Sequence, residues 1–409
     1  MKKQLTLSLF LLSISFFSNA QNIDIQNIKN HIVYLADDKL EGRATDTKGA
    51  AKAAKYIKKQ FKKISLLPKG TDGFYHIYTY KNANMHGIED VNSKPHTGTN
   101  VVGYIDNGAE NTIVIGAHYD HLGLGHDGNS LDPNPSDKIH NGADDNASGV
   151  AGVIELARHY QNNDLKEPYN LLFICFSGEE LGLFGSKKYC EMPTIDLKKV
   201  DIMINMDMIG RLNAEKSILV GGVGTAPELY NIIGYTDKGD IRTKIDSSGI
   251  GPSDHTSFYL KDIPVLFFFT GQHSDYHKPS DDADKINYEG EIQVLQVISK
   301  IVDGCMSFPK LAFTKTKSKQ SDTPAFSVTL GIMPDYTFDQ KGLRVDGVTD
   351  GKPAFKAGLK AGDVILQLGD TEVISIQEYM QGLAKFKKGE STTVKVKRGT
   401  EEKVFNVTF

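Results

Sequence analysis

Residues 142–149 read Gly-Ala-Asp-Asp-Asn-Ala-Ser-Gly, an acidic turn between glycines that leads into a helix-like segment at 147–160. Further helix-like segments lie at 24–36, 47–63, 226–236, 254–260 and 288–306, and short apolar runs lie at 100–105, 112–117, 171–176, 200–206 and 264–270. Residues 65–98, with scattered Pro, Gly and Asn, are expected to be irregular. Strands that alternate with helices predict the α/β class, with a mostly parallel, mixed central sheet flanked by helices.

Four other stretches carry acidic or imidazole groups. They read GAHYD at 116–120, SGEE at 177–180, NMD at 205–207 and YHKP at 276–279. Alone, each has an ordinary explanation, since an Asp before a helix is often a cap and a Glu pair after a strand is usually solvated. Ligands of open α/β sheets bind at the carboxyl ends of the strands, so these groups are expected to converge. Together they predict a two-metal site with one carboxylate left free to move a proton.

The overall composition narrows the possible classes of protein. The chain has 409 residues and a formal net charge of −4. Its length predicts more than one domain, and the lack of a basic excess argues against nucleic-acid binding. The three cysteines, an odd number, argue against a fold built on disulfides.

Residues 1–20 have the features of a secretory signal peptide. Lys2 and Lys3 precede an apolar stretch at 5–17, and Ser18-Asn19-Ala20 places small residues at the cleavage position. The apolar stretch is short for a membrane span, so no stable membrane insertion is expected. We therefore expect an exported protein, periplasmic or extracellular.

A change in composition divides the rest of the chain. Residues 309–325 are rich in Lys, Thr and Ser and include two prolines, as in a linker. The expected organisation is a large domain at 21–308, a linker at 309–325 and a compact unit rich in Gly and Val at 326–409.

The motifs at 142–149, 177–181 and 276–281, taken as a set, resemble those of the co-catalytic zinc aminopeptidase family, over roughly residues 24–307. This family includes secreted bacterial leucyl aminopeptidases and glutamate carboxypeptidase-like enzymes. The resemblance implies two zinc ions, for which cobalt or manganese could substitute. It implies that one ion is held by His118, Asp145 and Asp207, and the other by Asp145, Glu180 and His277.

The resemblance also implies that Glu179 is the general acid/base, that Asp120 orients the imidazole of His118, and that a cis peptide follows Asp145. Neighbouring side chains of extended backbone point to opposite sides, so Glu180 can bind metal while Glu179 stays unligated. A free Glu at that place can take a proton from water and give it to the leaving amine.

Other residues near the motifs compete for these roles. His273 is the closest rival to His277, which we prefer because His-Lys-Pro-Ser-Asp-Asp fits the family pattern. His121 and His140 are expected near the site without touching metal. The resemblance further implies a wall of the substrate pocket made by Ser253, Asp254, His255, Phe258 and Tyr259.

Residues 326–409 resemble a PDZ domain of the kind found in bacterial exported proteases. Leu330, Gly331 and Ile332 fit the loop that captures a C-terminal carboxylate. PDZ domains bind peptide ends by adding a strand to a sheet edge, which makes a C-terminal peptide the expected ligand. A unit that only packs on the larger domain remains an alternative.

These features together predict an exported di-zinc metallopeptidase that removes N-terminal residues from peptides. A carboxypeptidase or dipeptidase of the same family is the nearest alternative, with Arg211 as the candidate cation for a substrate carboxylate. A non-catalytic scaffold acting through the PDZ unit and a cyclase acting on N-terminal glutamine are more distant alternatives.

Overall fold

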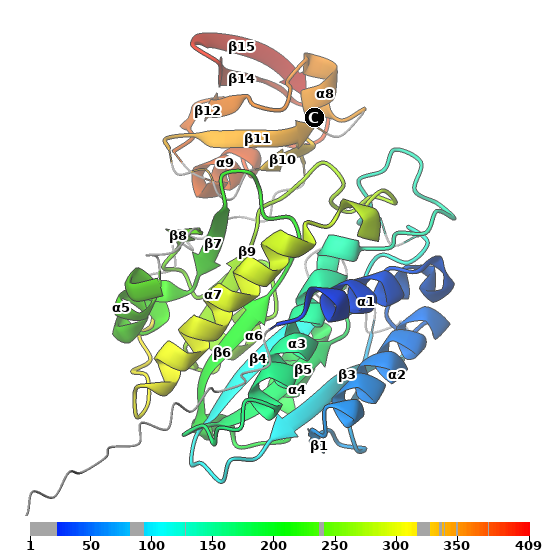
Figure 1. The fold of residues 1–409 in the computed structure, drawn as a ribbon. Helices are drawn as coiled ribbons and strands as arrows, with labels where there is room; N and C mark the ends of the chain where they lie inside the picture. Colours follow the sequence, from blue (N-terminus) through cyan, green and yellow to red (C-terminus); the bar gives the residue numbers. More distant parts are fainter. Residues whose placement is uncertain are drawn as a thin grey trace, which may run out of the picture.

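The computed structural model of the chain describes residues 23–81, 94–126, 128–236, 241–316, 328–334, 338, 340–348, 351–374 and 376–409. These residues form two units, each with its own hydrophobic core (Figure 1). The larger unit extends to residue 316, and the smaller begins at residue 328.

The larger unit alternates strands with helices. Its helices are α1 (Ile25–Leu35), α2 (Lys48–Lys63), α3 (Gly149–Gln161), α4 (Phe184–Glu191), α5 (Pro227–Thr236), α6 (His255–Tyr259) and α7 (Tyr288–Met306). Its strands are β1 (Leu67–Pro68), β2 (Tyr75–Tyr80), β3 (His96–Ile105), β4 (Thr112–His118), β5 (Asn170–Phe176), β6 (Val200–Met206), β7 (Ser217–Gly221), β8 (Arg242–Ile245) and β9 (Val265–Phe269). Its short helical turns are η1 (Asp38–Arg43), η2 (Ala143–Ser148), η3 (Leu197–Lys199), η4 (Val223–Thr225) and η5 (Ala283–Lys285).

The strands of this unit form one mixed sheet, of nine strands among the residues described, in the order β1-β3-β5-β4-β6-β9-β7-β8, with β2 paired to β3. The central strands β5, β4, β6 and β9 are parallel, whereas β3 and β7 run antiparallel to their inner neighbours. In the register, Gly116 of β4 is level with Ile174 of β5 and with Asn205 of β6. The carboxyl ends of these three strands therefore share one edge, and the predicted fold class is confirmed.

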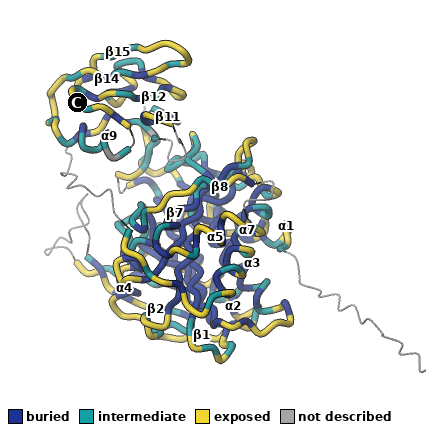
Figure 2. Tube along the Cα trace, turned by 90° about the vertical axis from the view of Figure 1, so that its left-hand side faces the viewer, coloured by how far each residue is buried: buried dark blue, intermediate teal, exposed yellow. Residues whose placement is uncertain are grey.

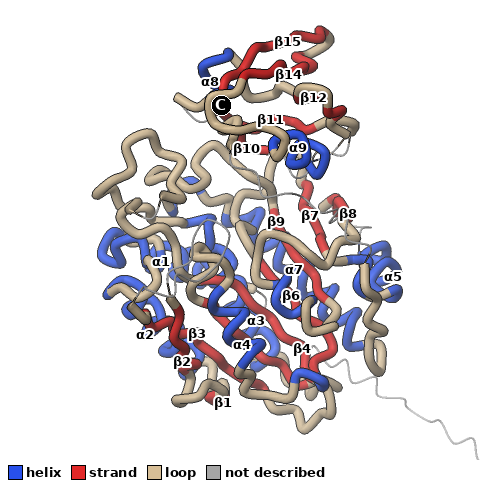
Figure 3. The backbone as a smooth tube through the Cα atoms, turned by 180° about the vertical axis from the view of Figure 1, so that it is seen from behind, coloured by secondary structure: helices blue, strands red, loops and turns tan. Residues whose placement is uncertain are grey.

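The sheet is buried on both faces because helices cover each of them (Figure 3). Ile113 and Ile115 of β4 lie in a core shared with α1, α2, α3 and α7, while Val114 lies in a second core shared with α4 and α6. This alternation follows from the two-residue period of a strand. The buried centre of the unit is the dark part of the tube in Figure 2.

Most predicted elements coincide with observed ones, including the helices at 24–36, 47–63 and 288–306. The expectation of irregular structure over 65–98 was wrong for β1 and for the start of β3 at His96. It was also wrong for Tyr75–Tyr80, which forms β2 against β3. Buried and exposed side chains alternate along β2, a strand pattern that the surrounding Gly and Asn residues concealed. Residues 82–93 lie outside the described part of the chain, and α4, β7 and β8 were not predicted.

The smaller unit is a β-rich domain. Its elements are β10 (Ile332–Pro334), β11 (Leu343–Val348), α8 (Pro353–Ala357), β12 (Val364–Leu368), β13 (Thr371–Glu372), α9 (Ile376–Leu383), β14 (Ser391–Arg398) and β15 (Glu401–Thr408). The described strands form an antiparallel sheet in the order β10-β11-β12-β14-β15. Buried Asp363 accepts two hydrogen bonds from the guanidinium of Arg398, at 2.6 and 2.8 Å, and so joins the start of β12 to the end of β14.

The segment after α7 lies against the larger unit. The main-chain N–H of Leu311 donates to Oδ1 of Asp201 at 2.7 Å, and that of Thr314 donates to the carbonyl of Thr225 at 2.7 Å. The predicted linker continues to residue 325, and its part from 317 onward lies outside the described residues, as does the predicted signal peptide.

The sequence predicted a fold that is not built on disulfides and has no stable membrane insertion. All three cysteines are buried and free. Within the described ranges, no helix has the length and apolar character needed to cross a bilayer.

Candidate metal centre

The ends of neighbouring strands carry most of the candidate side chains. His118 is the last residue of β4, Asp207 follows β6 directly, and Glu179 and Glu180 lie in the loop between β5 and α4. Because β5, β4 and β6 are parallel neighbours, these side chains meet at the carboxyl edge of the sheet. Asp145 reaches the same edge from η2, directly before α3.

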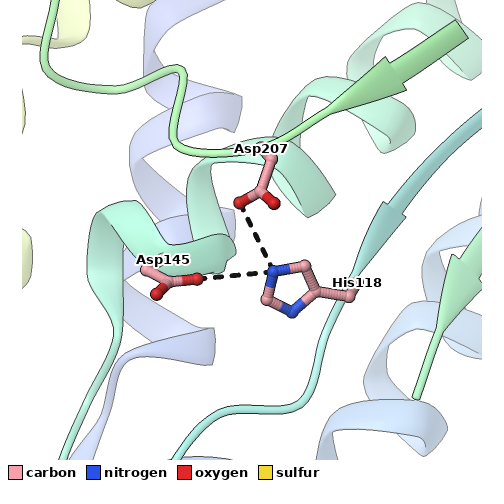
Figure 4. Close-up of side chains that lie close together, drawn as sticks. All are labelled: His118, Asp145 and Asp207. Atoms are coloured by element: carbon pink, nitrogen blue, oxygen red, sulfur yellow. Dashed lines mark ion pairs between the residues drawn. The ribbon is translucent and has the colours of Figure 1, made fainter. Parts of the chain in front are cut away.

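The first cluster consists of His118, Asp145 and Asp207 (Figure 4). Nε2 of His118 lies 3.4 Å from Oδ1 of Asp145 and 3.4 Å from Oδ1 of Asp207. Two donors bonded to one tetrahedral zinc at about 2.0–2.1 Å stand about 3.3–3.4 Å apart. The donor types and their spacing therefore fit a zinc ion.

The second cluster consists of Asp145, Glu180 and His277. Nε2 of His277, in the loop after β9, lies 3.3 Å from Oδ2 of Asp145 and 3.3 Å from Oε2 of Glu180. These distances again match two ligands of one zinc ion. Asp145 presents Oδ1 to the first cluster and Oδ2 to the second, which is the arrangement that a bridging carboxylate requires.

His121 also reaches the second cluster, through a contact that the sequence did not indicate. Its Nδ1 lies 2.8 Å from Oε1 of Glu180 and 3.8 Å from Oδ2 of Asp145. His121, Asp145 and Glu180 could therefore also be grouped as metal donors.

Two other histidines considered from the sequence have partners elsewhere. Nε2 of His273 lies 3.1 Å from Oδ2 of Asp144, and Nε2 of His140 lies 2.7 Å from Oγ of Ser130. Neither His273 nor His140 belongs to a group of possible metal donors among the described residues.

The adjacent glutamates differ in their electrostatic surroundings. Burial raises the pKa of Glu179 well above its usual range, and the negative charges of Glu180 and Asp207 add to this effect against the opposing influence of His118. Burial also disfavours the ionised form of Glu180, but His277 and His121 outweigh it and lower its pKa to about 2. Two carboxyl groups whose pKa values are pushed apart are suited to different tasks, one to proton transfer and the other to permanent negative charge.

Asp120 supports the loop that carries Glu179. Its Oδ1 accepts the main-chain N–H of Glu179 at 3.2 Å, and its Oδ2 accepts the hydroxyl of Thr45 at 2.9 Å. Nδ1 of His118 lies 3.2 Å from the main-chain oxygen of Asp120 and 3.8 Å from its carboxylate. The main chain is thus the nearer acceptor for the imidazole, whereas the sequence had suggested the carboxylate.

The turn that presents Asp145 is held from two directions. Oδ2 of Asp281 accepts the main-chain N–H groups of Asp144 and Asp145, both at 3.0 Å. Gly142 has a φ of +56°, and a Cβ there would come within 2.1 Å of the carbonyl oxygen of Asp145. Only glycine fits this position. The peptide bond between Asp145 and Asn146 is cis, as the family resemblance implied.

Arg43 is a central residue that the sequence did not reveal. Its side chain is fully buried, and burial lowers the pKa of the guanidinium to about 10. The guanidinium donates only to main-chain carbonyls in the contacts observed, namely those of Tyr119 (2.8 Å), Leu35 (2.6 Å), Gly142 (3.0 Å) and Asn141. It therefore ties the end of α1 to the segment after β4 and to the loop before Asp145. An arginine in an ordinary-looking turn gives no local signal of this role.

The predicted wall of the substrate pocket divides into two parts. Ser253, Asp254 and His255 are buried, and Oγ of Ser253 accepts a hydrogen bond from Asn205 at 2.8 Å. Burial raises the pKa of Asp254 to about 7 and lowers that of His255 to about 3.

Phe258 and Tyr259 have the contacts of core residues, in place of the substrate contact predicted for them. Both are buried in the core between the sheet and helices α4 and α6. The ring of Phe258 packs 6.1 Å from that of Phe176, and the hydroxyl of Tyr259 lies 3.0 Å from Oγ1 of Thr316.

The loop predicted to capture a carboxylate precedes β10 in the smaller unit. Leu330 is fully buried, and its carbonyl accepts the main-chain N–H of Ala354 at 2.9 Å. Gly331 has a φ of +72°, which favours glycine. Ile332 opens β10, a strand that, within the described residues, pairs on one side only, with β11.

The mixed sheet and the two donor clusters that share one aspartate define an α/β protein with a candidate metal site at the carboxyl edge of its sheet. Residues 100–302 match peptidase family M28, and residues 314–409 match the PDZ domain. The larger unit of the chain belongs to family M28, and the smaller is a PDZ domain. This confirms the resemblance read from the motifs.

Individual proteins resemble the chain in sequence or in fold. The chain is 30% identical over 200 residues to leupeptin-inactivating enzyme 1 of Streptomyces exfoliatus, across 48% of this chain and 41% of that protein. The chain thus spans well under two thirds of that relative's length. Among solved structures, a zinc aminopeptidase from Bacillus subtilis superposes with a TM-score of 0.55 and 17% identity, over 73% of this chain and 98% of that one. A glutaminyl cyclase from Bacteroides thetaiotaomicron superposes with a TM-score of 0.53 and 17% identity, over 69% and 98%.

Replacing Arg43 tests its structural role. Arg43→Met leaves buried carbonyls without donors, so we expect the free energy of unfolding to fall by about 3–5 kcal/mol. Arg43→Lys retains part of the hydrogen bonding, so its free energy of unfolding should lie between those of the wild type and Arg43→Met. Urea titrations of the metal-free protein, followed by near-UV circular dichroism of its tyrosines, measure both. A loss below about 1 kcal/mol for Arg43→Met would contradict the role.

Proposed function

We propose that this protein is an exported, zinc-dependent aminopeptidase that removes N-terminal residues from peptides. The observation that carries the proposal is the position of Asp145, with one oxygen 3.4 Å from His118 and the other 3.3 Å from His277. Membership of the larger unit in family M28 supports the same reaction class. Export is supported by the signal-like composition of residues 1–20.

Each of the two clusters would hold one metal ion. One zinc would be held by His118, Asp145 and Asp207, and the other by Asp145, Glu180 and His277. Bound zinc ions supply Lewis acidity, which polarises the scissile carbonyl and makes water a stronger nucleophile near neutral pH. Cobalt or manganese, which accept the same nitrogen and oxygen donors, could substitute.

Glu179 is positioned to move the proton. Its Oε2 lies 3.9 Å from Nε2 of His118, and it belongs to neither donor group. In the proposed reaction its carboxylate takes a proton from the attacking water as the oxygen bonds to the carbonyl carbon. It then delivers that proton to the leaving nitrogen as the C–N bond breaks. The elevated pKa of Glu179 suits a group that must both accept and return a proton.

The pairing of Arg211 favours a free N-terminus over a free C-terminus as the end of the substrate that is recognised. Arg211, the candidate cation for a substrate carboxylate, donates from Nη2 to Oδ2 of Asp275 at 2.8 Å. This pairing weakens the carboxypeptidase alternative. The presence of every donor of both clusters also argues against a non-catalytic scaffold and against a single-metal cyclase.

The PDZ unit would bind the C-terminal end of a peptide. Among the described residues, the edge of β10 that faces away from β11 has no neighbouring strand. Gly331 immediately precedes β10 and has a left-handed conformation. An added peptide strand at this edge would bring its terminal carboxylate to the loop at residues 329–331.

Glu179→Gln tests the proton-transfer role. The amide keeps the size of the side chain but cannot accept the proton, so kcat should fall by about 10²–10⁴-fold while zinc content stays unchanged. Hydrolysis of Leu-p-nitroanilide and elemental analysis give the two readouts, with exposed Glu191→Gln as the matched control. Near-normal turnover of Glu179→Gln would refute the role.

A substrate panel tests the reaction class. Leu-p-nitroanilide should be hydrolysed, its N-acetylated form should not, and chelation should abolish activity until zinc is restored. Preferential cleavage of N-blocked dipeptides would instead establish a carboxypeptidase.

Peptide titrations test the PDZ ligand. A fluorescent peptide with an apolar C-terminal residue should raise its anisotropy on binding, and amidation of its terminal carboxylate should weaken binding at least tenfold. Equal binding of the free and amidated peptides would exclude carboxylate capture.

A further inference from the structure

The two oxygens of Glu180 face two different imidazoles. Oε2 lies 3.3 Å from Nε2 of His277, and Oε1 lies 2.8 Å from Nδ1 of His121. The first distance is that of two donors on one tetrahedral zinc, about 3.3–3.4 Å. The second is too short for such a pair and is typical of an N–H···O hydrogen bond. The two histidines therefore have different relations to the same carboxylate.

We infer that His121 is a positioning residue, which donates its Nδ1–H to Oε1 of Glu180 and leaves Oε2 to face the second metal. This inference rests on the proposed binding of two zinc ions. A carboxylate with both oxygens free can rotate or bind an ion through either or both of them. Hydrogen bonds to the partners of a metal ligand fix its orientation and raise metal affinity.

The orientation of the His121 ring is itself fixed. The side chain is fully buried, and its ring lies edge-on to that of His277 with centroids 5.8 Å apart. The ring also packs on Gly142, where a Cβ would come within 2.5 Å of two ring atoms. Gly142 in turn accepts a hydrogen bond from Arg43. The loop that carries Asp145 therefore sets the direction in which Nδ1 points.

The remaining contacts of the ring favour positioning over ligation. Nε2 of His121 is buried and has no hydrogen-bond partner among the described residues. Nδ1 lies 3.8 Å from Oδ2 of Asp145, which is longer than the separation expected of two zinc ligands. The short contact to Glu180 is thus the interaction that the ring is placed to make.

Two substitutions separate hydrogen bonding from ligation. His121→Asn places an amide N–H near the position of Nδ1 and can donate to Glu180, whereas His121→Gln places its amide near the position of Nε2 and cannot. His121→Leu removes the donor at similar volume. Zinc stoichiometry and the dissociation constant of each ion, measured by competition with a chromogenic chelator, are the readouts, and Asp145→Ala is the positive control for metal loss.

We expect His121→Leu and His121→Gln to weaken the second zinc by about 10–100-fold while the first is retained. His121→Asn should stay within a few-fold of wild type. An equal loss of zinc affinity in all three variants would show that His121 is itself a ligand or only packs. Unchanged zinc affinity in His121→Leu and His121→Gln would show that the hydrogen bond has no effect. Either result overturns the inference. If His121→Leu fails to fold, the comparison of Asn with Gln remains. Wild-type protein that binds a single zinc would instead overturn the two-zinc proposal, and this inference with it.

Discussion

The buried guanidinium of Arg43 is the constraint on which the metal edge depends. A charge removed from water is tolerated only when its N–H groups find acceptors, and here the acceptors are main-chain carbonyls from three separate segments. Those segments must keep their conformation for Arg43 to remain satisfied. The positive charge also lies among the buried acids of the site and offsets part of their mutual repulsion; these acids are Asp145, Asp120, Asp281 and Glu180.

The chemistry of the proposed centre depends on a difference in pKa between two adjacent glutamates. Glu179 and Glu180 are adjacent in the chain and both largely removed from water, yet burial and nearby acids raise the pKa of Glu179 while imidazoles lower that of Glu180. The difference arises from what each carboxylate faces: acidic groups lie near Glu179, and the imidazoles of His277 and His121 lie near Glu180. Asp120 contributes by holding the main chain of Glu179 with its carboxylate, while its main-chain oxygen lies next to Nδ1 of His118.

Much of the fold was predictable from local patterns. The parallel strands at the centre are buried over their whole length because both faces are covered, and their largely apolar runs are recognisable in the sequence. Strand β2, at the side of the sheet, was not recognised because turn-forming residues surround it and only alternate side chains are buried. Helix α4 is short, and its buried positions depend on packing against the sheet rather than on a strong pattern of its own.

The sequence alone established the chemical types of the donors, their order along the chain and the family to which the larger unit belongs. These follow from short motifs whose residues are close in the chain. Only the tertiary structure decided which oxygen of Asp145 faces which histidine, that His121 contacts Glu180, that Phe258 is a core residue, and that Arg43 joins distant loops. The reason is physical: hydrogen bonds and ligand distances are set within a few tenths of an ångström by packing between segments far apart in the chain, and no local pattern records that packing.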